Sequence, residues 1–449
     1  MVNSKLRRFI SPFKIIILGF FLVIMAGALL LTLPISTQTG EWAKFSDALF
    51  TAVSATCVTG LIVQNTAEYW SFFGQLIILI LIQIGGMGVI TVAMAITRYS
   101  GKKITLMQRS TMQEAIAAPQ MGGMVQFTGF VLKYTFMIEG IGAVSMMPTF
   151  IKQFGFFKGL WYSIFHSVSA FCNAGFDLMG EHNGDTSLMC YSDNPFINIP
   201  ITLLIIFGGI GFLTWKDFEQ HKLRFKKYKT QSKMALITTA VLLIVPALVF
   251  FIFEFSSEEW SYMSLSEKML ASWFQSVTPR TAGFNTVNLA DMTPSSQLLT
   301  ILLMLTGGTS GSTAGGFKTT TLAVLFATVI SVFRKKPYTQ SLGRKISSDS
   351  VRNAATVFLL YIVMFLLGGF LICHIDGVPL LSALYEAASA VGTVGLTLGI
   401  TSTLSLASQV ILMFLMFFGR VGGLTIIFAL ISDMKPVRYK LPEEKITVG

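Results

Sequence analysis

The sequence predicts an all-α integral membrane protein. We expect eight transmembrane helices plus four re-entrant pore helices, arranged as four helix–pore loop–helix repeats around a pseudo-fourfold pore. Three observations predict this fold: an apolar composition, basic clusters in every second connection, and a short motif that recurs four times. Of the 449 residues, 53% are hydrophobic and only 12% are charged, which is more apolar surface than a soluble core buries.

The apolar residues form runs long enough to cross a bilayer, which takes about 20 residues. Eight such runs lie near 13–33, 72–97, 127–150, 196–214, 234–254, 297–330, 354–374 and 408–431. The run at 297–330 is too long for one straight helix, and a glycine-rich loop interrupts it. This pattern predicts eight spans, with the sixth span broken.

Basic residues orient the chain. They cluster in the two termini and in every second connection, at 5–14, 98–109, 216–233, 334–352 and 435–445. The other connections are acidic, so the positive-inside rule predicts a multi-pass protein of the cell membrane with both termini cytoplasmic. Because the net charge of +11 is spread between apolar runs, it indicates membrane lipid as the partner and excludes nucleic acid. The four cysteines lack CxxC spacing, which argues against zinc or a disulfide framework.

Each acidic region contains a segment too short to cross the membrane, and the four segments end alike. They lie near 44–55, 158–171, 266–278 and 379–391. Each is followed by a glycine with an aromatic residue ten positions earlier; the glycines are Gly60, Gly175, Gly283 and Gly395, and the aromatics Phe50, Phe165, Trp273 and Tyr385. Close helix packing explains any single glycine, but it does not explain an aromatic at a fixed distance before all four.

The turns that follow the four short segments are suited to bind a cation. Irregular backbone is tolerated at membrane depth where it lines a cavity or is buried in protein. The C-termini of re-entrant helices carry partial negative charge, and carbonyl groups replace a cation's water shell. The side chains beside the glycines are small and uncharged. We therefore predict a filter for a monovalent cation made of Cys57, Val58, Thr59, Gly60, Cys172, Asn173, Ala174, Gly175, Arg280, Thr281, Ala282, Gly283, Gly392, Thr393, Val394 and Gly395.

The glycine-rich loop 307–321 resembles a phosphate-binding loop, but Phe317 interrupts that pattern and a nucleotide does not reach this depth. Its glycines and hydroxyls suit a flexible plug in the ion path. Lys318 and Arg420 place charges within apolar runs, where they face a cavity or a partner, or are tied to main-chain carbonyls at a glycine kink. The plug and the two basic residues near it comprise Gly307, Gly308, Thr309, Ser310, Gly311, Ser312, Thr313, Ala314, Gly315, Gly316, Lys318 and Arg420.

Two further charged residues lie within the apolar part of the chain. Arg280 directly precedes a filter turn, and we expect it behind the filter, hydrogen-bonded to backbone and paired with Glu386. Glu139 lies within a span, and the sequence names no partner for it.

The repeat, the segment PRTAGFN at 279–285 and the loop GSTAGGFKTTT at 311–321 resemble the Trk/Ktr/HKT superfamily of potassium transporters, with a length most similar to its Ktr membrane subunits. The resemblance implies one filter glycine per repeat, potassium as the transported ion, loop 307–321 as the gate, and Arg420 as an electrostatic barrier. Gly60, where sodium-selective relatives carry serine, favours potassium; sodium dependence stays open. The resemblance also implies a homodimer and a cytosolic ring of nucleotide-binding regulatory subunits.

Two other functions compete with this interpretation. A secondary transporter for a small anion would use Lys318 and Arg420 as binding charges, although such proteins usually show two inverted repeats. An ATP-hydrolysing pump needs a large soluble domain, and the connections between the predicted spans are too short to form one. We therefore expect no enzyme activity. The predicted repeats span 1–110, 111–232, 233–350 with the gating loop 307–321, and 351–449 with a cytoplasmic tail.

Overall fold

The computed structural model describes residues 11–101, 104–116, 122–180 and 187–431, together with 442 and 444. The terminal basic clusters predicted at 5–14 and 435–445 lie largely outside these residues. The regular structure is helical apart from a small antiparallel hairpin, β1 (Gln340–Ser341) with β2 (Arg344–Lys345). The all-α class is therefore confirmed for the described part of the chain.

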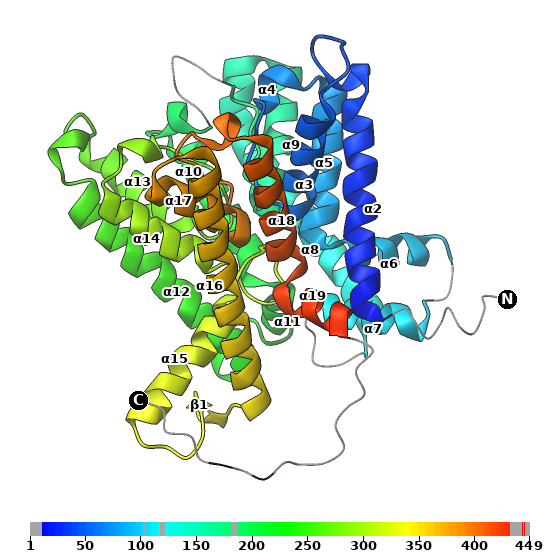
Figure 1. The fold of residues 1–449 in the computed structure, drawn as a ribbon, viewed down its shortest axis with the longest axis vertical. Helices are drawn as coiled ribbons and strands as arrows, with labels where there is room; N and C mark the ends of the chain where they lie inside the picture. The colour runs from blue at the N-terminus through cyan, green and yellow to red at the C-terminus, as the bar shows by residue number, and fades with distance from the viewer. Residues whose placement is uncertain are drawn as a thin grey trace.

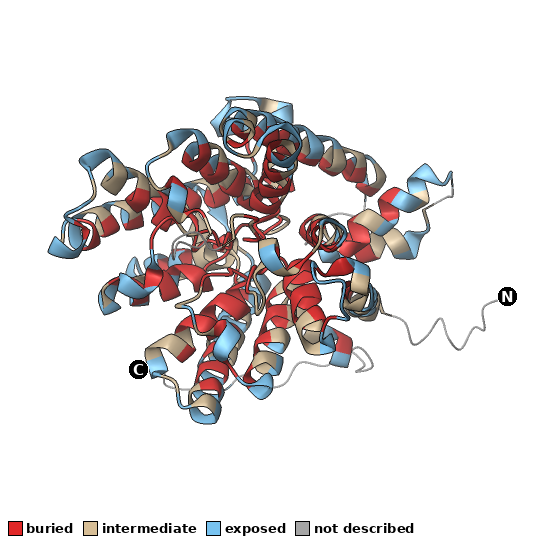
Figure 2. Cartoon of the chain, turned by 90° about the horizontal axis from the view of Figure 1, so that it is seen from above, coloured by how far each residue is buried: buried red, intermediate tan, exposed pale blue. Residues whose placement is uncertain are grey.

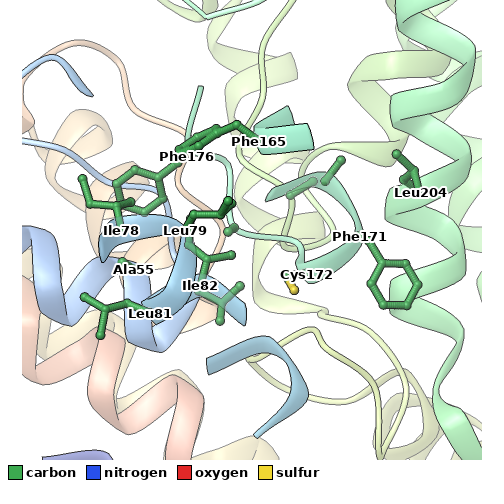
Figure 3. Close-up of a cluster of buried hydrophobic side chains, with 14 of the residues drawn as sticks. Ala55, Ile78, Leu79, Leu81, Ile82, Phe165, Phe171, Cys172, Phe176 and Leu204 are labelled. Carbon is green, nitrogen blue, oxygen red and sulfur yellow. The ribbon is translucent and has the colours of Figure 1, made fainter. Parts of the chain in front are cut away.

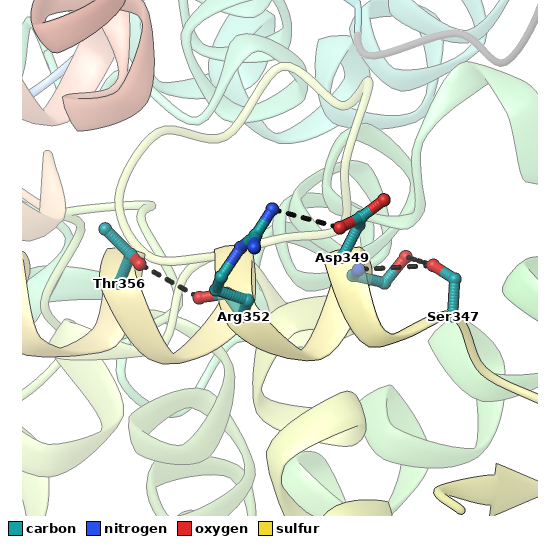
Figure 4. Close-up of polar contacts among 5 residues, drawn as sticks. Ser347, Asp349, Arg352 and Thr356 are labelled. Carbon is teal, nitrogen blue, oxygen red and sulfur yellow. Dashed lines mark hydrogen bonds and ion pairs between the residues drawn. The ribbon is translucent and has the colours of Figure 1, made fainter. Parts of the chain in front are cut away.

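Four helices in this part of the chain are continuous, apolar and long enough to cross a membrane. They are α2 (Pro12–Thr32), α8 (Met124–Phe154), α12 (Thr230–Val249) with its π-helical extension to Glu254, and α16 (Ser348–Asp376). Figure 1 shows α2 and α16 as long, nearly vertical rods and α12 as a rod inclined to them. The start of α16 is fixed by Ser347, whose hydroxyl caps the helix by accepting from the Ser350 amide at 3.2 Å, and by the Arg352–Asp349 ion pair at 3.0 Å (Figure 4).

Three of the predicted spans are bent pairs of helices. The pairs are α5 (Phe72–Met87) with α6 (Val89–Tyr99), α10 (Pro195–Ile210) with α11 (Phe212–His221), and α18 (Leu406–Val421) with α19 (Gly423–Ile431). The bends measure 96°, 92° and 91°. Each lies at a glycine with positive φ, at Gly88, Gly211 or Gly422, a conformation that ends an α-helix at little cost only in glycine. The sequence analysis predicted 72–97, 196–214 and 408–431 as spans but did not predict these bends.

The corresponding segment of the third repeat is broken more widely. Helix α14 (Pro294–Leu305) ends before the predicted gating loop, and α15 (Thr319–Phe333) begins after it. Thr306 and Phe317 form an isolated parallel bridge that brings the two ends of the loop together. The apolar run at 297–330 is thus interrupted where the glycine-rich sequence predicted.

Four short helices point into the centre of the molecule, close to the predicted positions. They are α3 (Phe45–Cys57), α9 (Phe156–Cys172), α13 (Leu265–Val277) and α17 (Leu380–Gly392). Seen from above in Figure 2, the helices surround a central zone of buried, mostly non-helical segments. Of the aromatic residues that recur in these helices, Phe50, Phe165 and Tyr385 are fully buried. Figure 3 shows Phe165 in an apolar cluster with Phe176, Ile78 and Leu79.

Smaller elements complete the described fold. They are α4 (Thr66–Tyr69), α7 (Leu106–Ala115) and the short 3-10 turns Pro34–Ser36, Met189–Tyr191, Phe225–Lys227, Glu258–Trp260, Leu289–Asp291 and Thr401–Thr403.

Candidate functional site

The four short helices end in the same backbone turn. In each repeat the residue two positions before the recurring glycine has positive φ, and so has the glycine. The φ values are 58° and 93° for Val58 and Gly60, 59° and 68° for Asn173 and Gly175, 74° and 84° for Thr281 and Gly283, and 52° and 94° for Thr393 and Gly395. Positive φ is rare for Val and Thr, and such strain persists at functional sites where the surroundings enforce it.

The four turns meet in one closed ring. A Cβ built on Gly60 would lie 2.5 Å from the Ala174 carbonyl oxygen, and one on Gly175 would lie 2.6 Å from that of Ala282. The series continues with Gly283 at 2.4 Å from the Val394 oxygen and closes with Gly395 at 2.2 Å from the Thr59 oxygen. Each glycine therefore abuts the next repeat, and the order one, two, three, four returns to one. Any side chain at these positions would collide with main-chain atoms.

Hydroxyl groups of the short helices hold the turns in shape. Ser54 accepts a hydrogen bond from the Gly60 amide at 3.1 Å, and Ser389 accepts one from Gly395 at 3.0 Å. Ser169 instead donates to the Phe176 carbonyl at 2.7 Å. Each hydroxyl lies six residues before its glycine, so it connects the end of the helix to the segment that leaves the ring.

The third repeat closes its turn differently. Helix α13 ends at Val277, which cannot supply a hydroxyl, and the next residue, Thr278, donates to the Phe284 carbonyl. Pro279 follows Thr278 and has no amide hydrogen to continue the helix. Six residues before the ring glycine the other repeats have serine and the third has Val277, so a search for the serine position misses Thr278. The threonine one position later is the signal that could have found it.

Buried oxygen atoms without hydrogen-bond partners collect in these turns, and every repeat contributes one. They are Thr59 Oγ1, Asn173 Oδ1, Thr281 Oγ1 and Thr393 Oγ1, and the four residues are fully buried. An unsatisfied buried polar atom costs about 1–3 kcal/mol. The lone pairs of these four oxygens are free to coordinate a ligand that accepts lone pairs, such as a cation, while the three hydroxyls and Arg280 Nε also remain unpaired donors.

The predicted gating loop packs directly below the ring. Its main chain is hydrogen-bonded to the second repeat through Thr309 N to Gly209 O at 2.9 Å, and to the fourth repeat through Gly316 N to Gly419 O at 3.1 Å. Thr313 donates to the Phe171 carbonyl at 2.9 Å and accepts from the Asn173 side-chain amide at 3.1 Å. The loop is therefore held by helices α10 and α18 and by the end of α9 with its turn at Asn173.

The close approach at Gly315 and Gly316 explains why the loop contains glycine there. A Cβ on Gly315 would lie 2.1 Å from Thr393 Oγ1, and one on Gly316 would lie 2.8 Å from the Gly392 carbonyl oxygen. The loop thus touches the fourth repeat at the turn itself.

Arg420 connects this loop to the first repeat. Its guanidinium donates to the Thr313 carbonyl in the loop and to the carbonyls of Gly85 and Gly86 at the end of α5, the last at 3.0 Å. Lys318 Nζ donates to carbonyls of its own loop, Ala314 at 2.7 Å and Gly315 at 3.2 Å. Both charges are thus tied to main-chain carbonyls near glycine bends, and for Arg420 those carbonyls belong to two other repeats.

A cavity of about 290 Å³ lies against this loop. Its lining includes Ser310 and Gly316 of the loop, the two basic residues Lys318 and Arg420, and Gly86. The cavity therefore adjoins the loop on one side, and the loop contacts the turns of the ring on the other.

Glycines of the bent helices pack against the short helices. A Cβ on Gly85 would lie 2.1 Å from the Thr56 carbonyl oxygen, one on Gly208 2.0 Å from Phe171 O, and one on Gly419 2.2 Å from Val391 O. Each of these carbonyls lies four residues before a ring glycine. Gly419 is therefore the counterpart of Gly85 and Gly208 in the fourth repeat.

The expected Arg280–Glu386 pair was wrong. Arg280 is buried and donates to the Thr239 hydroxyl of α12 at 3.5 Å, and not to backbone. Glu386 is occupied by the hydroxyls of Thr397 and Thr401. The Arg280 side chain points toward α12 and away from the fourth repeat. The sequence pattern does not predict this direction.

Glu139, for which the sequence named no partner, lies behind the second turn. Gln83 donates to its carboxylate at 3.3 Å, and the Cys172 thiol lies 3.8 Å from it. Ser167 donates to its main-chain carbonyl at 2.6 Å. These contacts connect α8 to α5 and to the end of α9.

These features define an all-helical, multi-pass membrane protein whose repeats meet at a ring of buried oxygen atoms. The sequence matches the TrkH family of cation transport proteins over residues 4–436, and the chain belongs to that family. It is 39% identical over 455 residues to the potassium/sodium uptake protein NtpJ of Enterococcus hirae, covering 100% of both chains. It is also 39% identical over 447 residues to the Ktr system potassium uptake protein B of Bacillus subtilis, covering 99% of this chain and 98% of the other.

A solved structure shows the same fold. The crystal structure of the potassium transporter TrkH from Vibrio parahaemolyticus matches with a TM-score of 0.71 at 21% identity, covering 97% of this chain and 86% of the other. The family consists of transport proteins and not of enzymes.

Proposed function

We propose that this protein takes up potassium across the cell membrane through the ring of four turns, which acts as a selectivity filter. The relatives that it matches over nearly their whole length are named for potassium uptake. The sixteen predicted filter residues all belong to, or directly adjoin, the four turns. Potassium is the transported substrate in this proposal.

The unpartnered oxygens at the ring carry the proposal. Each repeat offers one buried side-chain oxygen without a partner, beside main-chain carbonyls that adjoin the glycines. Oxygen atoms replace the water shell of an alkali ion. The C-termini of α3, α9 and α17 end at the turns, and their partial negative charge favours a cation there.

The proposed topology has eight membrane crossings and four re-entrant helices. The four long helices, the three bent pairs and the broken pair α14–α15 supply the crossings, and α3, α9, α13 and α17 supply the re-entrant helices. The basic connections in the sequence support a cytoplasmic position for the loop side of the ring and for both termini.

Loop 307–321 serves as the gate in this proposal, and Arg420 holds it closed. The loop fills the path between the ring and the inner cavity, and its hydrogen bonds reach repeats two and four. Arg420 also connects the loop to the first repeat, through the carbonyls of Gly85 and Gly86. It places a positive charge where a cation would leave the filter.

An anion transporter that uses Lys318 and Arg420 is less well supported. Both side chains already donate to main-chain carbonyls. An anion would have to displace those acceptors, and the ring itself offers oxygens and no basic side chain directed at its axis. A cation pathway therefore fits the available hydrogen-bond donors and acceptors better than an anion site does.

We further propose a homodimer that works with a cytosolic regulatory ring of nucleotide-binding subunits. The name of the Bacillus subtilis relative refers to a Ktr system, in which it is one protein. Sodium enters the proposal as a coupling ion only through the name of the Enterococcus hirae relative.

Uptake in cells that lack their own potassium transporters tests the proposal. Rubidium uptake, competed with sodium, is measured with and without a co-expressed regulatory subunit. We expect saturable rubidium uptake that sodium inhibits only weakly. Uptake of a small anion without rubidium transport would reject the filter in favour of the anion alternative.

A further inference from the structure

Glu386 carries a buried carboxylate whose hydrogen-bond donors all come from one segment. The residue is fully buried, in helix α17 nine residues before Gly395. The hydroxyl of Thr397 donates to one oxygen, and the hydroxyl of Thr401 donates to the other at 2.7 Å. The Leu398 amide lies near this carboxylate as well. The two hydroxyl donors lie two and six residues after Gly395, and Leu398 lies three residues after it.

The carboxylate therefore ties the two sides of the fourth turn together. One side is the helix that ends at Gly392, and the other is the segment that leaves the ring after Gly395. Within that segment Thr401 donates to Thr397 at 3.0 Å, and the Gly399 amide donates to Thr397 at 2.9 Å. The whole segment is thus organised around Glu386.

The opposite repeat contains a matching contact. His166, nine residues before Gly175, is fully buried, and its Nε2 accepts from the Leu178 amide at 3.3 Å. Leu178 lies three residues after Gly175, as Leu398 lies three residues after Gly395. In the order of the ring, repeats two and four face each other across the axis.

The two other repeats lack this clamp. Thr51 and Phe274 lie nine residues before Gly60 and Gly283. The Thr51 hydroxyl has no partner, and a phenylalanine ring offers none. The clamp therefore occurs only in repeats two and four, which face each other across the ring. Glu386 makes more hydrogen bonds to its outgoing segment than His166 does.

We propose that Glu386 is a positioning residue for selectivity, which fixes the outward segment of the fourth repeat and through it the filter turn at Gly395. This inference rests on the proposed filter. Discrimination between potassium and sodium depends on the number and placement of the coordinating oxygens. A segment released from its clamp lets those oxygens follow the smaller ion.

The experiment compares rubidium uptake and its inhibition by sodium in E386Q, T397V and T401V, at equal amounts of protein in the membrane. Glu254 provides the matched control, because its carboxylate is also fully buried and accepts from Trp260 Nε1 at 2.9 Å and from Thr293 Oγ1 at 2.6 Å. Thr293 caps the start of α14 and belongs to none of the four turns. We expect E386Q to lower the rubidium-over-sodium preference about tenfold, the factor that 1.4 kcal/mol represents. T397V and T401V keep the carboxylate, and each should lower the preference by a smaller factor. E254Q should keep the wild-type preference.

Each result decides the inference. A preference within about twofold of wild type in E386Q, or in both threonine variants if E386Q does not reach the membrane, overturns it. An equal loss of preference in E254Q also overturns it, because any buried carboxylate would then serve. Wild-type protein that does not prefer rubidium to sodium rejects the filter itself and not the role of Glu386 alone.

Discussion

Gly60 and Gly395, at opposite ends of the chain, lie against each other. A Cβ built on Gly395 would come 2.9 Å from the Gly60 Cα and 2.2 Å from the Thr59 carbonyl oxygen. This contact closes the ring of four repeats, since the other three junctions follow the order of the sequence. A single chain thereby encloses an axis with four nearly equivalent turns.

Serine at position 60 is expected to lower the preference for potassium over sodium. Gly60 has a φ of 93°, and its Cβ would lie 2.5 Å from the Ala174 carbonyl oxygen, so the turn must shift. A loss of about tenfold in the rubidium-over-sodium preference is expected from uptake competition. Gly40→Ser is the control, because Gly40 also has positive φ, at 72°, but has no atom within 4 Å of the built Cβ. Unchanged selectivity in Gly60→Ser would refute the filter assignment.

Deletion of residues 311–316 is expected to give a faster and less regulated pathway. The segment supplies the Gly316–Gly419 bond and the contacts of Thr313 with the second repeat, and no other described segment replaces them. Rubidium uptake should rise and lose its dependence on the regulatory subunit. Abolished uptake in protein that still reaches the membrane would mean that the loop supports the ring and does not gate it.

Replacement of Arg420 by alanine should raise basal flux several-fold. The change removes the bonds from the loop to the first repeat and a positive charge beside the ion path. Lysine at this position should restore the charge but not the forked contacts, and so give an intermediate flux. Arg352→Ala serves as the control, because Arg352 is exposed and contacts only Asp349 through its guanidinium in the described structure (Figure 4). Loss of folded protein in Arg420→Ala, without added flux in the lysine variant, would assign Arg420 a structural role only.

Uptake should depend on external pH through Asp177, which lies in the segment that leaves the second turn. Burial raises the pKa of Asp177 from 3.8 to about 6, against hydrogen bonds from Met179 and Ser187 that lower it. The carboxylate is therefore ionised above about pH 6 and attracts cations there. As pH falls through 6 this charge is lost, and half-saturation for rubidium should rise roughly threefold.

Asn at position 177 should make half-saturation independent of pH in this range, whereas D193N, a change at an exposed acid, should leave the dependence intact. The same shift has a consequence for stability. Between about pH 4 and 6 the folded chain binds more protons at Asp177 than the unfolded chain does, so the free energy of unfolding should fall as pH rises. A pH profile that is identical in wild type and D177N would remove Asp177 from the pathway.

The sequence predicted the ring and the loop well because both depend on glycine. The four turns recur at a fixed distance from an aromatic residue, and the short helices α3, α9, α13 and α17 begin and end within a few residues of the predicted segments. The interruption at 306–318 was visible because polar residues seldom occur within an apolar run.

The sharp bends and the side-chain pairings were not predictable in the same way. A bend at Gly88 requires positive φ, and the apolar residues on both sides of it read as one continuous span. The partners of Arg280, Glu139 and Glu386 come from other helices or from a later segment, so hydropathy and spacing carried no information about them. Only the packing of α12 beside α13 shows why Arg280 meets Thr239.

The location of a bound alkali ion tests the central claim most directly. Crystals or frozen particles prepared in thallium, a potassium substitute with strong anomalous scattering, would locate the ion. We predict density on the axis between Gly60, Gly175, Gly283 and Gly395, within coordination distance of oxygens from all four repeats. Density confined to other cavities, with the ring empty at saturating thallium, would contradict the account.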